Sequence, residues 1–168
     1  VIALDLDTPY DIQGICVTLF DANHCPGAAM IQFETAGGNV VHTGDFRFHE
    51  KMQAYQFARP VDRLFLDTTY CDPKHCFPVQ EDSIKLMIDT IRSEIRRNDT
   101  EEKTLFLVSA YSIGKERLLL RLADEFGVPV FVEQNKTRKK LQCVVSDEQL
   151  SSCFTITRSN TWIHSCRM

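Results

Sequence analysis

Apolar residues in the first part of the chain fall into short strand-like runs. Residues 14–20 are rich in β-branched and aromatic side chains, and residues 28–35 form a second run of this kind. Gly37 and Gly38 accept positive φ, so they predict a hairpin turn into a partner strand at 40–43. Residues 1–70 are therefore predicted to be rich in β-strands.

Two further runs extend this prediction. Apolar and polar residues alternate over residues 1–6, as in the middle of a strand. Residues 63–67 have the pattern of a short buried strand. Because the first residue is Val rather than Met and the last residues carry no polar tail, we expect a piece of a larger protein.

After about residue 80 the apolar period becomes helical. One predicted helix face carries five apolar side chains: Ile84, Met87, Ile88, Ile91 and Ile95. Residues 105–109 predict a strand, 115–126 a helix and 130–132 another strand, with Gly127 and Pro129 ending the helix. This order predicts a βαβ unit with a parallel strand pair. We place a domain boundary near residues 71–78, where Pro and Cys interrupt the pattern.

Composition narrows the class of protein. The 168 residues, 43% of them hydrophobic, suffice for one ordinary domain or parts of two. A net charge of −4 argues against a nucleic-acid coat protein, but it allows a nuclease with a local basic patch. The seven Cys are predicted to be reduced thiols, since the chain has neither a signal-peptide pattern nor the form of a small disulfide scaffold. No apolar run is long enough to predict a transmembrane helix.

Three polar blocks, at 21–28, 42–46 and 66–70, each follow an apolar run. Strand ends are where α/β scaffolds usually hold their chemistry. One His and two Asp delivered in this way could share one metal ion or two. A metal site needs three or four protein ligands, so the blocks predict only part of a set.

His24 lies in the first block, on a loop that Pro26 and Gly27 make stiff. A neutral imidazole is the commonest metal ligand, although a loop His can also be merely exposed or hydrogen-bonded. Asp21 and Asn23 beside it could bond to the loop backbone instead of a metal.

Asp45 and Asp67 end the other two blocks. A carboxylate at the edge of a core is costly unless it is paired or coordinated, and Asp45 could bridge two cations through its two oxygens. The alternative is a turn Asp that caps its own backbone. Asp67 could ligate a metal, orient a ligand His or bind water, and its alternative is an Asx turn with the neighbouring Thr residues. His42, inside its strand, is interpreted as a supporting or packing residue.

The segment 109–116 lies between a predicted strand and a predicted helix. The first amides of a helix lack partners and attract anions, while Ser112 adds a hydroxyl and Lys115 a cation. The spacing is not that of a Walker A loop, so a phosphate of an ester substrate fits better than a nucleotide cofactor. A capped helix with a solvated Lys is the alternative.

Other groups carry less information. Two basic groups, one of Arg92, Arg96 and Arg97 and one at 136–140, could follow a nucleic-acid backbone or could be solvated faces. Cys71, His75 and Cys76 form only a weak metal-like cluster.

Taken together, four motifs resemble the DNA cross-link repair nucleases of the metallo-β-lactamase/β-CASP superfamily, which include Artemis and Apollo. The motifs are Asp-Ala-Asn-His-Cys-Pro-Gly-Ala at 21–28, His-Thr-Gly-Asp-Phe-Arg at 42–47, Leu-Asp-Thr-Thr-Tyr at 66–70 and Tyr-Ser-Ile-Gly-Lys-Glu at 111–116. The match runs over residues 14–144, and the form Leu-Asp-Thr-Thr-Tyr-Cys is most similar to the exonuclease branch.

The resemblance implies an α/β fold, namely a partial metallo-β-lactamase-like αββα sandwich with the start of an inserted β-CASP domain. Residues 1–72 would be the C-terminal part of the first metallo-β-lactamase half, and residues 73–168 the N-terminal part of the β-CASP domain.

The resemblance also implies roles for single residues. His24 and Asp45 would be metal ligands, with Asp45 a catalytic carboxylate that bridges the metals where two are bound. Asp67 would be a supporting catalytic acid. A terminal 5′-phosphate would be bound by Ser112, Gly114 and Lys115. The usual cofactor is zinc, as one or two ions, which activates water for phosphodiester hydrolysis.

The family's His-x-His-x-Asp-His block is missing, however, and the resemblance places it before Val1. The later β-CASP histidines would follow Met168, and His164 receives no role. The isolated segment is therefore expected to be inactive.

The function implied for the parent protein is a metal-dependent 5′-to-3′ DNA exonuclease acting in interstrand cross-link repair in the nucleus. Its partners would be DNA with a 5′-phosphate end and other repair proteins, with no membrane. The alternatives are an Artemis-like structure-specific endonuclease and a catalytically inactive repair scaffold. An RNA-processing β-CASP enzyme is less favoured, because its pattern usually carries Glu where Asp67 stands.

Overall fold

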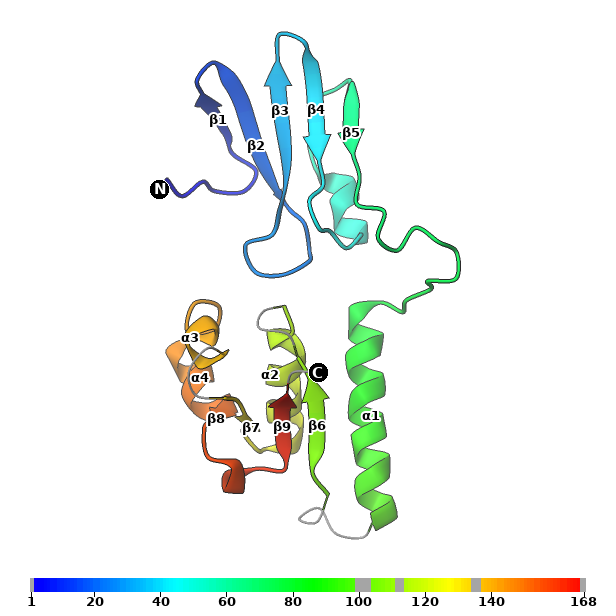
Figure 1. Cartoon of the computed structure of the whole chain (residues 1–168), viewed down its shortest axis with the longest axis vertical. Helices are drawn as coiled ribbons and strands as arrows, with labels where there is room; N and C mark the ends of the chain where they lie inside the picture. Colours follow the sequence, from blue (N-terminus) through cyan, green and yellow to red (C-terminus); the bar gives the residue numbers. More distant parts are fainter. Residues whose placement is uncertain (1, 99–103, 111–113, 134–136, 167–168) are drawn as a thin grey trace. The chain divides into compact units, whose positions relative to one another are not determined.

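The computed structural model describes residues 2–98, 104–110, 114–133 and 137–166 (Figure 1). The chain divides into two compact units, Val1–His75 and Cys76–Met168. The division falls within the interval 71–78, where proline and cysteine interrupt the sequence pattern. The assignment of the units to a metallo-β-lactamase half and a β-CASP domain stays a prediction.

The first unit is built on a five-stranded sheet in the order β1-β2-β3-β4-β5. Its strands are β1 (Pro9–Ile12), β2 (Ile15–Asp21), β3 (Ala29–Thr35), β4 (Gly38–His42) and β5 (Arg63–Phe65). Neighbours are antiparallel except β4 and β5, which are parallel. The predicted hairpin is confirmed as β3 and β4, which begin their pairing at Thr35 and Gly38.

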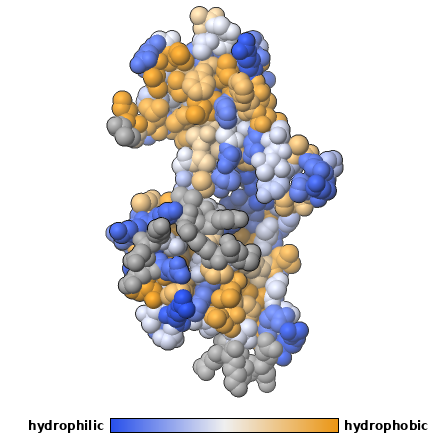
Figure 2. Space-filling model, viewed as in Figure 1, coloured by the Kyte–Doolittle hydropathy of each residue, from blue (hydrophilic) through white to orange (hydrophobic). Residues whose placement is uncertain are grey.

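Two strand predictions in this unit are wrong. Residues 2–5 have no regular structure, and the edge strand is β1, which the sequence pattern did not indicate. Strand β5 exists, but it is exposed rather than buried: Leu64 and Phe65 keep 57% and 53% of their surface. The reason is that β5 is an edge strand, and the described residues place no further strand beside it. Figure 2 shows hydrophobic residues on the visible face of this unit.

The segment between β4 and β5 packs against the sheet and forms the core of the first unit. Phe20, Ala22 and Met30 are buried under side chains of this segment, which are Phe46, Met52, Tyr55 and Phe57, together with Ala28. The segment includes a short 3₁₀ helix, η1 (Glu50–Ala54). The rings of Phe20 and Phe57 lie 4.5 Å apart. This packing fixes the loops that leave the ends of β2 and β4.

The second unit contains a four-stranded parallel sheet in the order β6-β9-β7-β8. Its strands are β6 (Phe106–Ser109), β7 (Val130–Phe131), β8 (Phe154–Thr155) and β9 (Ile163–Cys166). The predicted parallel direction of β6 and β7 is confirmed, but their predicted pairing is wrong. Strand β9 lies between them, because this later segment pairs with both. The pattern of residues 105–132 alone could not show that insertion.

Helices α1 (Gln80–Asn98), α2 (Glu116–Phe126), α3 (Thr137–Leu141) and α4 (Asp147–Cys153) complete the second unit, with a 3₁₀ turn at Arg158–Asn160. The predicted apolar face of α1 is confirmed, since Ile84, Ile88 and Ile91 are buried. Helix α2 ends at Gly127, which has a φ of 64°, as predicted. None of the seven cysteines, all of which lie in the described residues, forms a disulfide bond. None of the described helices is long and apolar enough to cross a membrane.

Replacing Gly38 with alanine should destabilise the first unit. Gly38 has a φ of 116°, and a Cβ there would lie 2.6 Å from the Asp62 carboxylate oxygen. Backbone strain of this kind costs about 1–3 kcal/mol, and the contact adds to it. Chemical denaturation should therefore show a lower unfolding midpoint for G38A. The matched control is G37A, because Gly37 has no positive φ and its nearest neighbour would be 3.7 Å away; an equal loss in both variants would contradict the explanation.

Candidate active site

The topology of the first sheet brings three strand ends to one edge. Strands β2 and β4 are both antiparallel to β3, and β5 is parallel to β4, so all three run in the same direction. Their carboxyl ends therefore meet at one edge of the sheet, where the three polar blocks begin (Figure 1). This arrangement explains how residues far apart in the sequence can form one site.

The loop after β2 holds His24 on a well-defined backbone. Residues 25–28 form a turn in which the Ala28 amide donates to the Cys25 carbonyl at 2.9 Å, with Gly27 at a φ of 84°. Pro at the second position and positive φ at the third are typical of a type II turn. The Asp21 carboxylate accepts from the Asn23 amide, and the Asn23 side chain donates to the Arg47 carbonyl. Asp21 and Asn23 thus bond to the loop backbone, as the alternative interpretation expected.

The loop after β4 holds Asp45. Gly44 has a φ of 56°, and its amide donates to Nδ1 of His42 at 2.9 Å. The His42 ring stacks on Phe65, with centroids 5.7 Å apart, which agrees with a packing role. A Cβ on Gly44 would lie 3.3 Å from the Ala29 carbonyl oxygen, so this turn leaves little room for a larger residue.

His24 and Asp45 come together at this edge of the sheet. Nε2 of His24 lies 4.0 Å from Oδ2 of Asp45. The two side chains keep 50% and 83% of their surface. The expectation that Asp45 lies at the edge of a core is therefore wrong, because its side chain is largely exposed to solvent. No hydrogen bond to its own turn is found for the Asp45 carboxylate in the described part of the chain, so the self-capping alternative is not observed either.

Asp67 is anchored by hydrogen bonds to two segments. Its Oδ1 accepts from the hydroxyl and the amide of Thr69, at 2.6 and 2.9 Å. Its Oδ2 accepts from the Phe46 amide at 3.4 Å, and its own amide donates to the Thr43 hydroxyl at 2.9 Å. Asp67 therefore forms the Asx-type turn that was its alternative interpretation, and it also bonds to the segment that carries Asp45.

These contacts change the acidity of Asp67. Hydrogen bonds from the Thr69 hydroxyl and then from the Thr69 amide hold the pKa of the Asp67 carboxyl below its ordinary value of 3.8, although desolvation acts in the opposite direction. The Phe46 amide and the charge of His24 act in the same lowering direction. Asp67 therefore carries a negative charge at neutral pH, directed at the segment that links β4 to η1.

The chemistry of His24 and Asp45 fits part of a zinc site. An imidazole nitrogen and a carboxylate oxygen are ligands that zinc accepts, and two ligands of one tetrahedral ion lie roughly 3.3 Å apart. The observed 4.0 Å is therefore within reach of a small side-chain movement. Among the described residues, however, no group of three or more His, Cys, Asp or Glu could hold a metal. His24 and Asp45 therefore provide two zinc ligands, which is fewer than a stable zinc site requires.

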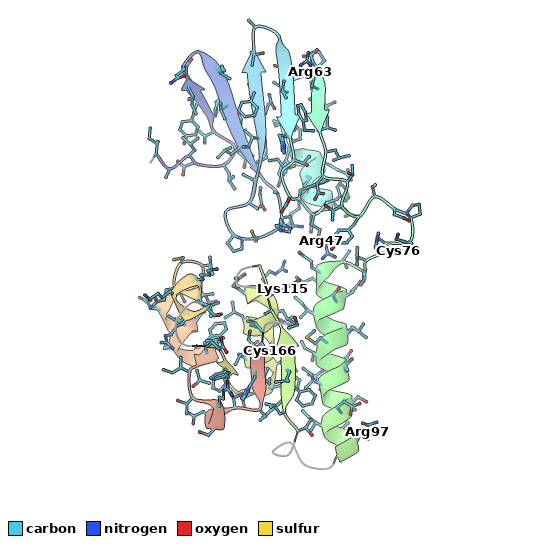
Figure 3. The ribbon with its side chains drawn as sticks, viewed as in Figure 1. Arg47, Arg63, Cys76, Arg97, Lys115 and Cys166 are labelled. Atoms are coloured by element: carbon cyan, nitrogen blue, oxygen red, sulfur yellow. The ribbon has the colours of Figure 1, made fainter. Side chains whose placement is uncertain are left out.

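The predicted phosphate-binding residues lie in the second unit. Ser112 is outside the described residues. Lys115 is the N-cap residue of α2, is exposed, and makes no ion pair with a described residue (Figure 3). The Gly114 amide donates to both carboxylate oxygens of Glu116 at 2.9 Å. An incoming phosphate would have to displace that carboxylate to use this amide.

Sequence reasoning missed Thr43 in the first unit. The Thr43 side chain is nearly fully buried, and its hydroxyl donates to the Gly44 carbonyl while it accepts from Asp67. No local pattern could reveal that bond, since 24 residues separate the partners. Thr69, in contrast, was among the Thr residues of the Asx turn that the sequence offered as the alternative for Asp67, and its amide and hydroxyl both donate to Asp67.

The other candidate groups do not form metal sites in the described part of the chain. Cys71 and Cys76 are exposed thiols, and His75 packs edge-on against Tyr70 at 5.3 Å. His164 lies in β9, where its Nε2 is 3.2 Å from the carbonyl oxygens of Arg158 and Thr161. His164 is therefore explained by the packing of its own sheet.

Comparison with known proteins places these features in context. No protein-family model matches the chain. It is 44% identical over 138 residues to the DNA cross-link repair protein SNM1 of Arabidopsis thaliana, with 80% of this chain and 28% of that protein covered. It is 40% identical over 163 residues to the DNA cross-link repair 1A protein of Mus musculus, covering 96% and 15%. The 5′ exonuclease Apollo of Gallus gallus is 39% identical over 126 residues, covering 74% and 26%.

The chain is a homologue of the DNA cross-link repair proteins of the SNM1 family, to which Artemis and Apollo are also related. It spans between 15% and 28% of the length of the three relatives described above. The activity, substrates and partners of a whole protein are therefore matters for proposal.

Replacing Thr69 with valine should raise the pKa of Asp67 toward its ordinary value. The substitution removes the hydroxyl donor that contributes most to the lowered pKa. A carboxyl ¹³C NMR titration would measure the change. T68V is the control, because the Thr68 side chain makes no described hydrogen bond.

Since the pKa of Asp67 is lower in the folded state, its contribution to stability is present above the ordinary carboxyl range and is lost as pH falls through the lowered pKa. T69V should therefore lose less stability than the parent chain between neutral and acid pH; an unchanged Asp67 titration would contradict the assignment.

Proposed function

We propose that this chain is part of a metal-dependent DNA repair nuclease, specifically a 5′-to-3′ exonuclease acting in interstrand cross-link repair in the nucleus. The observation that carries the proposal is the pair His24 and Asp45. These residues come from two separate strand-end loops and lie 4.0 Å apart. The homology to cross-link repair proteins, one of which is named a 5′ exonuclease, supports DNA as the substrate.

The proposed centre divides its tasks among three side chains. His24 and Asp45 would hold a zinc ion together with donors from outside this chain. A bound zinc ion supplies a lowered pKa for water and charge stabilisation at a phosphoryl oxygen. Asp67 is a positioning residue in this scheme, because it binds the Phe46 amide next to Asp45 and its own amide binds Thr43. The Pro26–Gly27 turn keeps the imidazole of His24 on a stiff loop.

The phosphate-binding residues are proposed to select the end of the DNA. Lys115 offers an exposed cation at the first turn of α2, and the amides there carry partial positive charge. Ser112 and Gly114 would add a hydroxyl and an amide donor. Because Glu116 accepts from the Gly114 amide, the 5′-phosphate would compete with this carboxylate.

A catalytically inactive repair scaffold is the second candidate. It is favoured by one observation, namely that the described residues contain no group of three metal donors. For the same reason we expect the isolated 168-residue chain not to digest DNA.

Replacing Asp45 with asparagine in the full protein that carries this chain should abolish digestion of a 5′-phosphorylated single strand. The change removes a charged ligand while keeping the shape of the side chain. A gel-based nuclease assay with added zinc measures the rate, and a loss of at least 100-fold is expected, in the range seen when an electrostatic contact to the reacting group is removed. D72N is the control, because Asp72 is an exposed residue whose carboxylate has the side chain and the amide of Lys74 as its described partners. Full activity of D45N would refute the metal-ligand role.

Replacing Lys115 with alanine should reduce the preference for a 5′-phosphate over a 5′-hydroxyl end. The expected loss in this ratio is at least about 10-fold, as for one charge-assisted hydrogen bond worth about 1.5–3 kcal/mol. Competition between the two substrates in one reaction measures the ratio directly. K85A is the matched control, since Lys85 is exposed on α1 and makes no ion pair among the described residues. Equal use of both ends by the unmodified protein would remove this role from Lys115.

A further inference from the structure

The chain carries two basic groups, which differ in whether their side chains form ion pairs with described residues. In the first group, on α1, Arg92 forms ion pairs with Asp89 and Glu125. Arg97 pairs with Glu94 at 2.8 Å. Arg97 also lies at the far end of α1 from Lys115 (Figure 3). Most of this group is therefore neutralised by the chain's own carboxylates.

The second group consists of Arg138, Lys139 and Lys140 on α3, and we call it the basic turn. None of its side chains forms an ion pair with any described residue. Lys139 and Lys140 are exposed, and Arg138 is half-buried. In Figure 2, hydrophilic residues lie on the visible surface where Figure 1 places α3.

The basic turn is held firmly on the second unit. Leu141, which ends α3, keeps 3% of its surface and packs into the core of this unit. The Gln142 amide donates to the Arg138 carbonyl at 3.0 Å, and the Val145 amide donates to the Leu141 carbonyl at 2.9 Å. Three adjacent cations are thus fixed close together without counter-charges from described residues, although the chain as a whole has a net charge of −4.

We propose that the basic turn binds the phosphodiester backbone of DNA. Three adjacent cations on a fixed turn repel one another, and a polyanion with regularly spaced phosphates removes this repulsion while releasing its own counterions. The proposed contacts join these cations to phosphate oxygens, and contacts of this kind position DNA without carrying sequence information. This inference rests on the proposed function for the choice of DNA, and it adds a contact apart from the residues assigned to metal and 5′-phosphate binding.

The test compares two variants, each of which loses three positive charges from a different part of the second unit. R138Q/K139Q/K140Q removes the basic turn, and K85Q/R96Q/R97Q removes three cations of α1. Fluorescence anisotropy with the full chain and a 5′-phosphorylated single-stranded DNA would give the affinity at several salt concentrations. The basic-turn variant should weaken binding at least 10-fold at low salt. It should also reduce the slope of log affinity against log salt by about 2, since each neutralised single-strand phosphate contributes about 0.7. The α1 variant should change the affinity less than 3-fold.

Several results would overturn the proposal. One is an unchanged slope of log affinity against log salt in the basic-turn variant. Another is an equal loss of DNA affinity in both variants, which would indicate a response to net charge alone. A loss of binding to anionic lipid vesicles with unchanged DNA binding would assign the basic turn to membranes instead. Unfolding midpoints equal to that of the parent chain establish that each variant is folded. If the full protein failed to digest DNA but the basic-turn variant still lost DNA affinity, the nuclease proposal would fail and the DNA contact would stand.

Discussion

The hydrogen bonds of Thr43 join the ends of two strands, and the geometry of the candidate site depends on them. Its amide donates to the Phe65 carbonyl at 2.9 Å, and its hydroxyl accepts from the Asp67 amide at 2.9 Å. Because Thr43 is nearly fully buried, both bonds are shielded from water and are costly to break. They place the segment after β4 beside the segment after β5, so that the loop carrying Asp45 and the carboxylate of Asp67 have a fixed relation.

The position of His24, the remaining residue of the site, follows from the direction of the strands. Since β2, β4 and β5 run the same way, His24 is delivered to the same edge as the two Asp residues. The core beneath it, where Phe20 and Met30 pack against Tyr55 and Phe57, keeps the loop ends in place. Exposed polar side chains can then stand on a rigid support, which suits residues that have to bind a ligand from solvent.

The second unit shows how the same kind of residue can serve stability or binding. Arginines on α1 are used in ion pairs, one of which connects α1 to α2 through Glu125. Glu116 likewise satisfies an amide at the start of α2. In contrast, Lys115 and the basic turn have no acidic partner among the described residues. Lys115 and the basic turn can therefore bind a negatively charged ligand without first breaking a described ion pair.

The sequence by itself determined the local elements and the chemical character of the site. Its periodicity predicted the β3–β4 hairpin and the buried face of α1, because these features depend on neighbouring residues alone. Its motifs singled out His24, Asp45 and Asp67. Only the tertiary structure decided that β9 separates β6 from β7, that β5 is an exposed edge, and that Asp45 faces solvent rather than a core. Each of these features depends on contacts between residues far apart in the chain, which no local pattern encodes.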